Sequence, residues 1–186
     1  MFLLFILCSL QGNSFKAMDT HYILAITPFV FCKDKIAMNW KIYLSGEIHT
    51  NWREEIEQQI QSLDLPIETY APVTDHASSD DCGVSILGAE DDKFWHDNKG
   101  AKVNAIRTRT LIEKSDIVVV CFGEKYKQWN AAFDAGYASA LGKSLIIMHG
   151  PDHQHALKEV DAAALAVTRT PDEVVKVLRY VINGEL

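Results

Sequence analysis

The segment FGEKYKQWNAAFDAGYASALGK, residues Phe122–Lys143, lies between two short apolar runs. These runs, Ile117–Cys121 and Ser144–Met148, have the length and composition of buried strands. The alanine-rich part between them predicts a helix, for which Asn130 is a good N-cap residue. A strand, a polar loop, a helix and a second strand form one βαβ unit. Because ligands of open α/β sheets bind beyond the carboxyl ends of the strands, we expect this loop to border a binding site.

One carboxylate interrupts the apolar face of this helix. Asp134 shares the face with Ala131, Ala138 and Leu141, at spacings of three and four residues. An isolated buried charge is very costly, so Asp134 must be paired, protonated or directed into a cleft. An ordinary carboxylate near a helix N-terminus, stabilised by the helix dipole, explains the pattern equally well. The sequence leaves both interpretations open.

Strands and helices alternate along the rest of the chain. The expected strands are Lys41–Ser45, Ile67–Tyr70, Ile117–Cys121, Ser144–Met148 and Leu165–Val167. The other expected helices are Trp52–Leu63, Lys99–Lys114 and Pro171–Val181, the last with a capping box from Thr170 to Glu173. This rhythm predicts an α/β fold: a single-domain, flavodoxin-like, doubly wound five-stranded parallel sheet in the order 2-1-3-4-5. The loops Gly46–Asn51 and Phe122–Asn130 then meet at the switch point between strands 1 and 3.

Two segments lack this rhythm. Ala71–Asn98 is rich in Asp, Ser and Gly, and we expect a long irregular insertion there. Residues 1–37 show no clean periodicity, so we expect a non-core N-terminal extension before a domain over residues 38–186. The apolar start Met1–Leu10 is too short to cross a bilayer, and no basic residue precedes it. A signal peptide is the competing interpretation of this start.

Composition excludes several classes of function. The net charge of −7 argues against binding to duplex DNA or RNA, which requires a basic face. The four cysteines form no CxxC pair, and we therefore expect reduced thiols in a cytoplasmic protein that does not bind a membrane. Neither a Walker loop nor a GxGxxG motif is present, which disfavours P-loop enzymes and NAD dehydrogenases.

The two loops at the switch point carry residues suited to a small ligand. The first offers Gly46, Glu47, His49 and, just after it, Arg53, next to a helix N-terminus whose N–H groups favour an anion. The second offers Glu124, Tyr126, Asn130 and Trp129, whose ring suits stacking on a nucleobase. Surface solvation of the His and the Arg is the alternative interpretation.

The two segments that contain these loops resemble the sequence motifs of a known superfamily. Lys41–Arg53, KIYLSGEIHTNWR, resembles the opening strand and loop of the nucleoside 2-deoxyribosyltransferase superfamily. Lys114–Lys143 resembles its second signature, a strand beginning with Asp, a loop, and a helix with a carboxylate, Gly-x-Ala and a later Gly-Lys. The motifs GEIHTxWR and FGEKYKQWN resemble most closely the YtoQ family. The resemblance covers the chain from Met38 to its C-terminus.

The resemblance implies a flavodoxin-like fold and oligomers with sites near subunit boundaries. It also implies a carboxylate that attacks C1′ of a deoxynucleoside, after which the base departs and a second base or water takes the sugar. Asp134 falls at the nucleophile position, where the transferases carry Glu, and Tyr43 falls on the tyrosine that orients the nucleophile. Residues Gly46 to His49 match the loop that holds the sugar or, in nucleotide-hydrolysing relatives, a 5′-phosphate.

The sequence therefore predicts transfer or hydrolysis of the N-glycosidic bond of a nucleoside or nucleotide, without a metal or cofactor. Asp134 would attack, Tyr43 would hold it, and Glu47 or Glu124 would protonate or orient the base. The expected substrate-binding residues are Gly46, His49, Arg53, Arg107, Gly123, Glu124, Trp129 and Asn130. The partners expected are a small nucleoside or nucleotide and further copies of the chain, as a homo-oligomer. The alternatives are a nucleotide-binding module without turnover and an NAD glycohydrolase.

Overall fold

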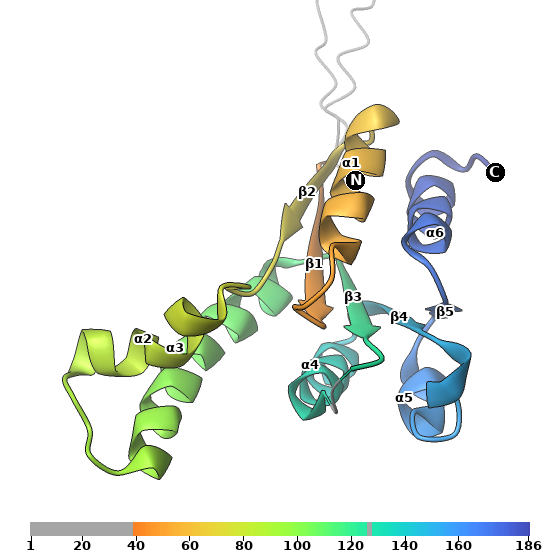
Figure 1. Cartoon of the computed structure of the whole chain (residues 1–186). Coiled ribbons are helices and arrows are strands. Elements are labelled where there is room, and N and C mark those ends of the chain that lie inside the picture. Colours follow the sequence, from red (N-terminus) through yellow and green to blue (C-terminus); the bar gives the residue numbers. More distant parts are fainter. Residues whose placement is uncertain (1–38, 126–127) are drawn as a thin grey trace, which may run out of the picture. The chain divides into compact units, whose positions relative to one another are not determined.

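Five parallel strands form one sheet in the order β2–β1–β3–β4–β5 (Figure 1). The computed structural model describes residues 39–125 and 128–186. The strands are β1 (Trp40–Gly46), β2 (Ile67–Tyr70), β3 (Ile117–Phe122), β4 (Ser144–His149) and β5 (Ala166–Thr168). The predicted fold and strand order are thus confirmed. The expected extension over residues 1–37 lies outside the described residues, as does Tyr126.

Helices connect the strands on both faces of the sheet. They are α1 (Trp52–Ser62), α2 (His76–Leu87), α3 (Lys93–Lys114), α4 (Trp129–Ala140), α5 (Lys158–Ala163) and α6 (Pro171–Asn183), with a 3₁₀ turn η1 (Pro151–His153). Helix α6 begins as predicted, because the Thr170 hydroxyl accepts from the Glu173 N–H at 3.3 Å. None of the helices in the described ranges combines the length and apolar character that crossing a bilayer requires.

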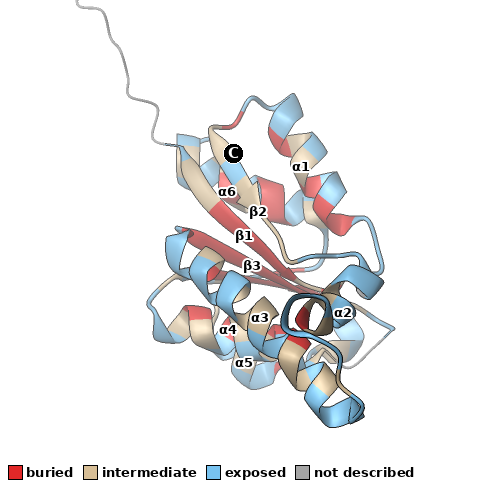
Figure 2. Ribbon diagram, turned by 90° about the vertical axis from the view of Figure 1, so that its left-hand side faces the viewer, coloured by how far each residue is buried: buried red, intermediate tan, exposed pale blue. Residues whose placement is uncertain are grey.

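Each face of the sheet has its own apolar core, as expected for a doubly wound fold. Alternate residues of a strand point to opposite faces, so Ile42 and Leu44 of β1 pack with helices α1 and α6. Tyr43 points the other way, into a core that includes α3 and the buried alanines of α4. Figure 2 shows β1 and β3 buried at the centre of this arrangement. Because Ser45 is two residues after Tyr43, it faces the α4 side too.

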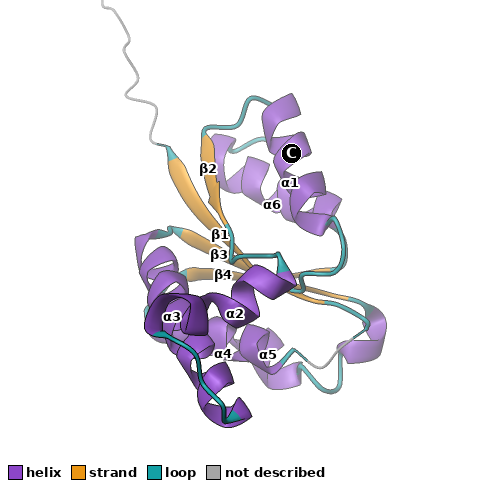
Figure 3. Ribbon diagram, turned by 60° about the vertical axis from the view of Figure 1, so that its left-hand side comes forward, coloured by secondary structure: helices purple, strands orange, loops and turns teal. Residues whose placement is uncertain are grey.

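The long irregular insertion expected over Ala71–Asn98 is wrong. It contains α2 and the first turns of α3, which pack as a helical hairpin (Figure 3). Gly83 and Gly100 allow this packing, because a Cβ on Gly83 would lie 2.2 Å from the Gly100 nitrogen. The carboxylates of Asp75 and Asp92 cap the two helices by accepting backbone N–H groups. The hairpin is stabilised by contact between its own helices, which hydrophobic periodicity does not report.

Smaller corrections concern element boundaries. Helix α4 begins at Trp129 with Gln128 as its N-cap residue and without a side-chain cap bond, so Asn130 is not the cap. Strand β5 lies one residue later than predicted, and α5 was not expected. On α4, Ala135 is buried, whereas Leu141 is 42% exposed, so the buried stripe is narrower than the sequence indicated.

The two loops at the switch point approach each other at Gly46. This residue has a φ of +102°, and a Cβ there would lie 2.1 Å from the carbonyl oxygen of Cys121. Only glycine therefore fits between β1 and β3 at this point. The next residue, Glu47, donates its backbone N–H to the same carbonyl at 3.0 Å. The first loop is thus held against the end of β3, as the predicted topology requires.

Candidate active site

A cavity of about 1000 Å³ opens over the switch point, between the first loop, α3 and α4. It is lined by seven of the residues predicted from the sequence: Gly46, Glu47, His49, Arg107, Trp129, Asn130 and Asp134. The predicted residues Tyr43, Arg53, Gly123 and Glu124 do not line it. Ser45 and several α3 residues, among them Asn104 and Thr108, line the cavity and were not predicted.

Asp134 is half-buried on the cavity side of α4. Its Oδ2 atom accepts a hydrogen bond from the Ser45 hydroxyl at 2.6 Å, across the gap between α4 and β1. Burial raises the pKa of the Asp134 carboxyl above its ordinary value, and the Ser45 hydrogen bond acts in the opposite direction. Of the two interpretations left open by the sequence, the carboxylate directed into a cleft is the one observed.

Tyr43 lies beneath the cavity and is fully buried. Its hydroxyl bonds to Thr108 Oγ1 at 3.5 Å, while the role of donor to Asp134 falls to Ser45. Burial, with a smaller contribution from the charge of Asp134, raises the pKa of Tyr43 to about 12, and the Thr108 bond acts in the opposite direction. Tyr43 is therefore a neutral group near Asp134. Ser45 could have been found from the sequence, because it follows Tyr43 on the same face of β1.

The Glu47 side chain is turned onto its own loop and is only 3% exposed. Its carboxylate accepts hydrogen bonds from the backbone N–H groups of His49 and Thr50 and from the Thr50 hydroxyl. Gly123 of the second loop packs directly against it, since a Cβ there would lie 2.2 Å from Glu47 Cγ. Three donors converge on this carboxylate, which is the environment of an acceptor. The geometry does not favour Glu47 as a proton donor to a base.

Arg53 is buried, with 4% of its surface exposed. Its guanidinium donates to the backbone carbonyls of Leu44, Gly46 and Glu47 and lies over the Trp52 ring at 4.4 Å. Burial lowers the pKa of Arg53 from its ordinary value. The sequence suggested that this guanidinium would bind a phosphate. It instead donates to three backbone carbonyls at the end of β1 and the start of the first loop, which is a structural role.

The remaining predicted residues are divided between the cavity and its surroundings. Arg107 of α3 lines the cavity and donates from Nη2 to the Ala71 carbonyl at 3.3 Å. Glu124 is 66% exposed and faces away, with its Oε1 atom 3.7 Å from His153 Nδ1. Gly123 donates its N–H to the side chain of Gln128 at 2.8 Å, which ties the second loop to the start of α4.

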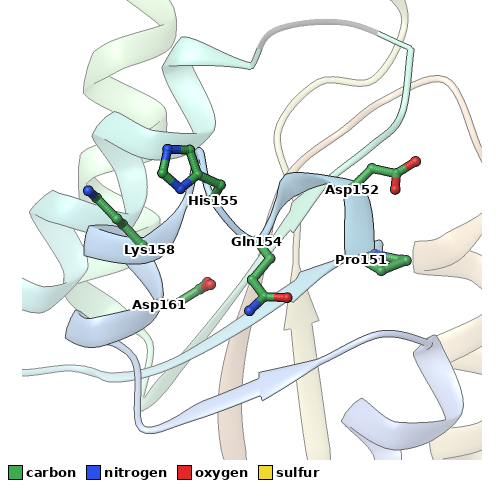
Figure 4. Close-up of a pocket in the computed structure, with 6 residues that line it drawn as sticks. All are labelled: Pro151, Asp152, Gln154, His155, Lys158 and Asp161. Carbon is green, nitrogen blue, oxygen red and sulfur yellow. The ribbon is translucent and has the colours of Figure 1, made fainter.

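A second, smaller cavity of about 560 Å³ lies beside η1 and α5 (Figure 4). It is lined by polar residues that include His155, Lys158 and Asp161, and by none of the residues predicted for the site. Asp161 is already paired with buried His149 of β4, whose Nε2 lies 3.1 Å from Asp161 Oδ2. Among the residues that the structure describes, no cluster of three or more His, Cys, Asp or Glu side chains is arranged to hold a metal ion.

The parallel sheet and the cavity over its switch point define a flavodoxin-like α/β protein with a candidate small-ligand site. The family model described as nucleoside 2-deoxyribosyltransferase YtoQ matches residues 43–182. The chain therefore belongs to the YtoQ family of nucleoside 2-deoxyribosyltransferase-like proteins. It is 43% identical over 148 residues to the uncharacterized protein YtoQ of Bacillus subtilis, covering 80% of this chain and all of the relative.

Two solved structures resemble the chain at low sequence identity. A conserved protein from Enterococcus faecalis is 17% identical with a TM-score of 0.52, covering 76% of this chain and 98% of the other. A 2-deoxyribosyltransferase from Bacillus psychrosaccharolyticus is 17% identical with a TM-score of 0.45, covering 73% and 90%. The likeness to the Enterococcus protein shows the same α/β architecture.

Proposed function

We propose that the protein transfers or hydrolyses the N-glycosidic bond of nucleosides or nucleotides, with Asp134 as the nucleophile. The observation that carries this proposal is the placement of Asp134: a half-buried carboxylate, lining the cavity over the switch point and hydrogen-bonded by Ser45. Membership of the YtoQ family supports the same class of reaction. Covalent catalysis by a carboxylate needs a nucleophile whose position is fixed. The 2.6 Å hydrogen bond from Ser45 holds the Asp134 carboxylate in one position.

The proposed reaction has two steps. A carboxylate oxygen of Asp134 bonds to C1′, and the bond from C1′ to the base nitrogen breaks, with its electron pair leaving on the base. The base takes up a proton from water at the open side of the cavity, where Trp129 and Asn130 are exposed. A second base or a water molecule then attacks C1′ and gives up its proton to the solvent. The bond from C1′ to Asp134 breaks with its electron pair returning to the carboxylate, so the configuration at C1′ is retained.

The cavity walls suit the two parts of such a substrate. Trp129 and Phe133, four residues apart on α4, line the cavity and are 74% and 60% exposed. Aromatic faces of this kind stack on nucleobases. Arg107 and His49 line other parts of the wall and are assigned to the polar groups of the sugar. The family resemblance extends the proposal to a homo-oligomer, and the cysteine usage extends it to a cytoplasmic protein.

Base release provides the test. The protein is incubated with deoxynucleosides, deoxynucleoside monophosphates and NAD, and free base is separated by chromatography. We expect release by the wild type and a loss of about 10³-fold or more in Asp134→Ala, since the nucleophile is removed. Asp152→Ala, a change at an exposed carboxylate of η1, serves as the matched control. Absence of release by the wild type, or undiminished release by Asp134→Ala, would reject the proposal.

A nucleotide-binding module without turnover is the second candidate. It is favoured by the aspartate at the nucleophile position, which is one methylene shorter than the glutamate of the transferases. A displacement of about 1 Å can cost about a hundredfold in rate. In that case a nucleoside or nucleotide would raise the Tm without any release of base, because a ligand that binds only the native state stabilises it.

A further inference from the structure

We propose that Glu47 makes the cavity select nucleosides with a free 5′-hydroxyl over 5′-phosphorylated nucleotides, by occupying the anion site of the first loop with its own carboxylate. This inference rests on the proposed function and narrows its substrate class. It concerns the loop that the sequence suggested as a holder of phosphate.

The first loop has the hydrogen-bond donors of an anion site, and the Glu47 carboxylate already accepts from them. The backbone N–H groups of His49 and Thr50 and the Thr50 hydroxyl all point at the Glu47 carboxylate. Consecutive N–H groups ahead of a helix are the usual means of binding a phosphate oxygen. Here the bound anion belongs to the chain itself. A substrate phosphate could reach these donors only after displacing Glu47.

The packing of the loop opposes that displacement. Glu47 is 3% exposed, and its Cγ fills the space that the missing side chain of Gly123 leaves. Its backbone is fixed on both sides, with its N–H bonded to Cys121 and its carbonyl bonded by Trp52 Nε1 at 2.8 Å and by Arg53. Rotating the carboxylate away would therefore break three hydrogen bonds and move a buried side chain out of its packing.

The Arg53 guanidinium, the other group that could bind a phosphate next to this loop, is also already hydrogen-bonded within the protein. A guanidinium is well suited to phosphate because it presents a planar set of donors. The guanidinium of Arg53 donates instead to three backbone carbonyls and is 4% exposed. Neither the backbone donors of the first loop nor the Arg53 guanidinium is therefore left for a substrate phosphate.

Charge acts in the same direction. A phosphomonoester carries a charge of roughly −1.5 to −2 at neutral pH. The 5′ carbon and C1′ belong to the same small sugar, so a phosphate on a substrate placed for attack by Asp134 enters a cavity that also holds Glu47. Like charges in a partly desolvated site repel each other strongly. The cations that line the cavity, Lys93, Arg107 and Arg109, all lie on α3, whereas Glu47 lies in the first loop.

The experiment compares base release from a deoxynucleoside and from its 5′-monophosphate. We expect the wild type to favour the nucleoside in kcat/KM by about tenfold or more. Glu47→Ala frees the three donors, so the ratio should shift toward the monophosphate by a similar factor. Inorganic phosphate should then raise the Tm of Glu47→Ala but not that of the wild type. Glu55→Ala removes the same charge from an exposed position on α1 and should behave as the wild type.

The outcomes separate this inference from the proposed function. If neither substrate releases base in the wild type, the proposed function fails, and the Tm response to phosphate still tests Glu47. If the wild type prefers the monophosphate, and Arg107→Gln removes the preference, the cations of α3 bind the phosphate and the inference is overturned. A Tm response to phosphate in the wild type overturns it as well. Should Glu47→Ala fail to fold, Glu47→Gln keeps the side-chain volume, and a shift toward the monophosphate is required of it too.

Discussion

The two chain segments that meet at the switch point differ in how they use their polar groups. The first loop is closed on itself: Glu47 is bonded by donors of the loop, and Arg53 is bonded to its carbonyls. The start of α4 is open: Trp129 is 74% exposed, and Asp134 reaches the cavity with one hydrogen bond from β1. The contrast indicates a division of labour, in which the loop forms a fixed wall and α4 presents the reactive and stacking groups.

The difference has a physical origin. Where the chain leaves the end of a strand, backbone carbonyls lose their ladder partners and must be satisfied in another way. In this molecule Arg53, in the first turn of α1, donates to these carbonyls. A charged residue just beyond a strand end is therefore not a ligand-binding group by position alone. Helix α4 satisfies its backbone internally, and its side chains remain available for the cavity.

Removal of Arg53 is the strongest way to break the closed loop. Arg53→Ala removes the guanidinium donor of the Leu44 and Gly46 carbonyls and one of the two side-chain donors of the Glu47 carbonyl, so the free energy of unfolding should fall by about 3 kcal/mol. Urea denaturation followed by circular dichroism measures the loss. The control, Arg169→Ala at an exposed position before α6, should change stability by no more than about 0.5 kcal/mol. A loss for Arg53→Ala as small as that of the control would show that the loop does not depend on the guanidinium.

The hydrogen bond from Ser45 to Asp134 allows a test of the reactive role assigned to α4. Ser45→Ala removes the donor that opposes the burial-driven rise in the pKa of Asp134, so that pKa should rise further. Because attack requires the carboxylate, the rate falls as the pH drops through this pKa, and the variant should lose activity at a higher pH than the wild type. Below neutral pH we expect a loss of about tenfold, measured as the pH profile of kcat.

Tyr43→Phe is the matched comparison for Ser45. The Tyr43 phenol has a pKa of about 12 and bonds to Thr108, so its removal takes away no charge and no donor to Asp134. The midpoint of the acid limb should therefore stay where it is in the wild type. A shifted midpoint in Tyr43→Phe, together with an unshifted one in Ser45→Ala, would return the positioning role to the tyrosine, as the sequence had suggested.

The stacking surface of α4 gives the smallest expected effect. Trp129→Ala should raise the KM for a nucleoside by about fivefold, because stacking of a base on an aromatic ring is worth about 1 kcal/mol or more. Stability should change little, since the side chain is 74% exposed. Trp95→Ala changes an exposed tryptophan of α3 that does not line the cavity and should leave KM unchanged. Equal KM values for the two variants would place the base elsewhere in the cavity.

The sequence predicted those parts of the fold that follow from local patterns. Apolar runs identified the strands, and Thr170, Pro171 and Glu173 marked the start of α6. The hairpin of α2 and α3 was missed because it depends on the contact of Gly83 with Gly100, two residues that carry no apolar periodicity. Its capping residues, Asp75 and Asp92, are typical N-cap residues. They did not indicate helices because no apolar periodicity follows them in the sequence.

Seven of the eleven predicted site residues line one cavity, because the order of strands already determines which loops meet. The sequence by itself determined that order, the carboxylate on an otherwise apolar helix face, and the glycine between two strand ends. Only the tertiary structure decided which group holds Asp134 and what Glu47 and Arg53 bind. Ser45 is 89 positions away from Asp134 along the chain. A bond between such distant residues depends on the packing of a helix on a sheet, and local periodicity does not encode that packing.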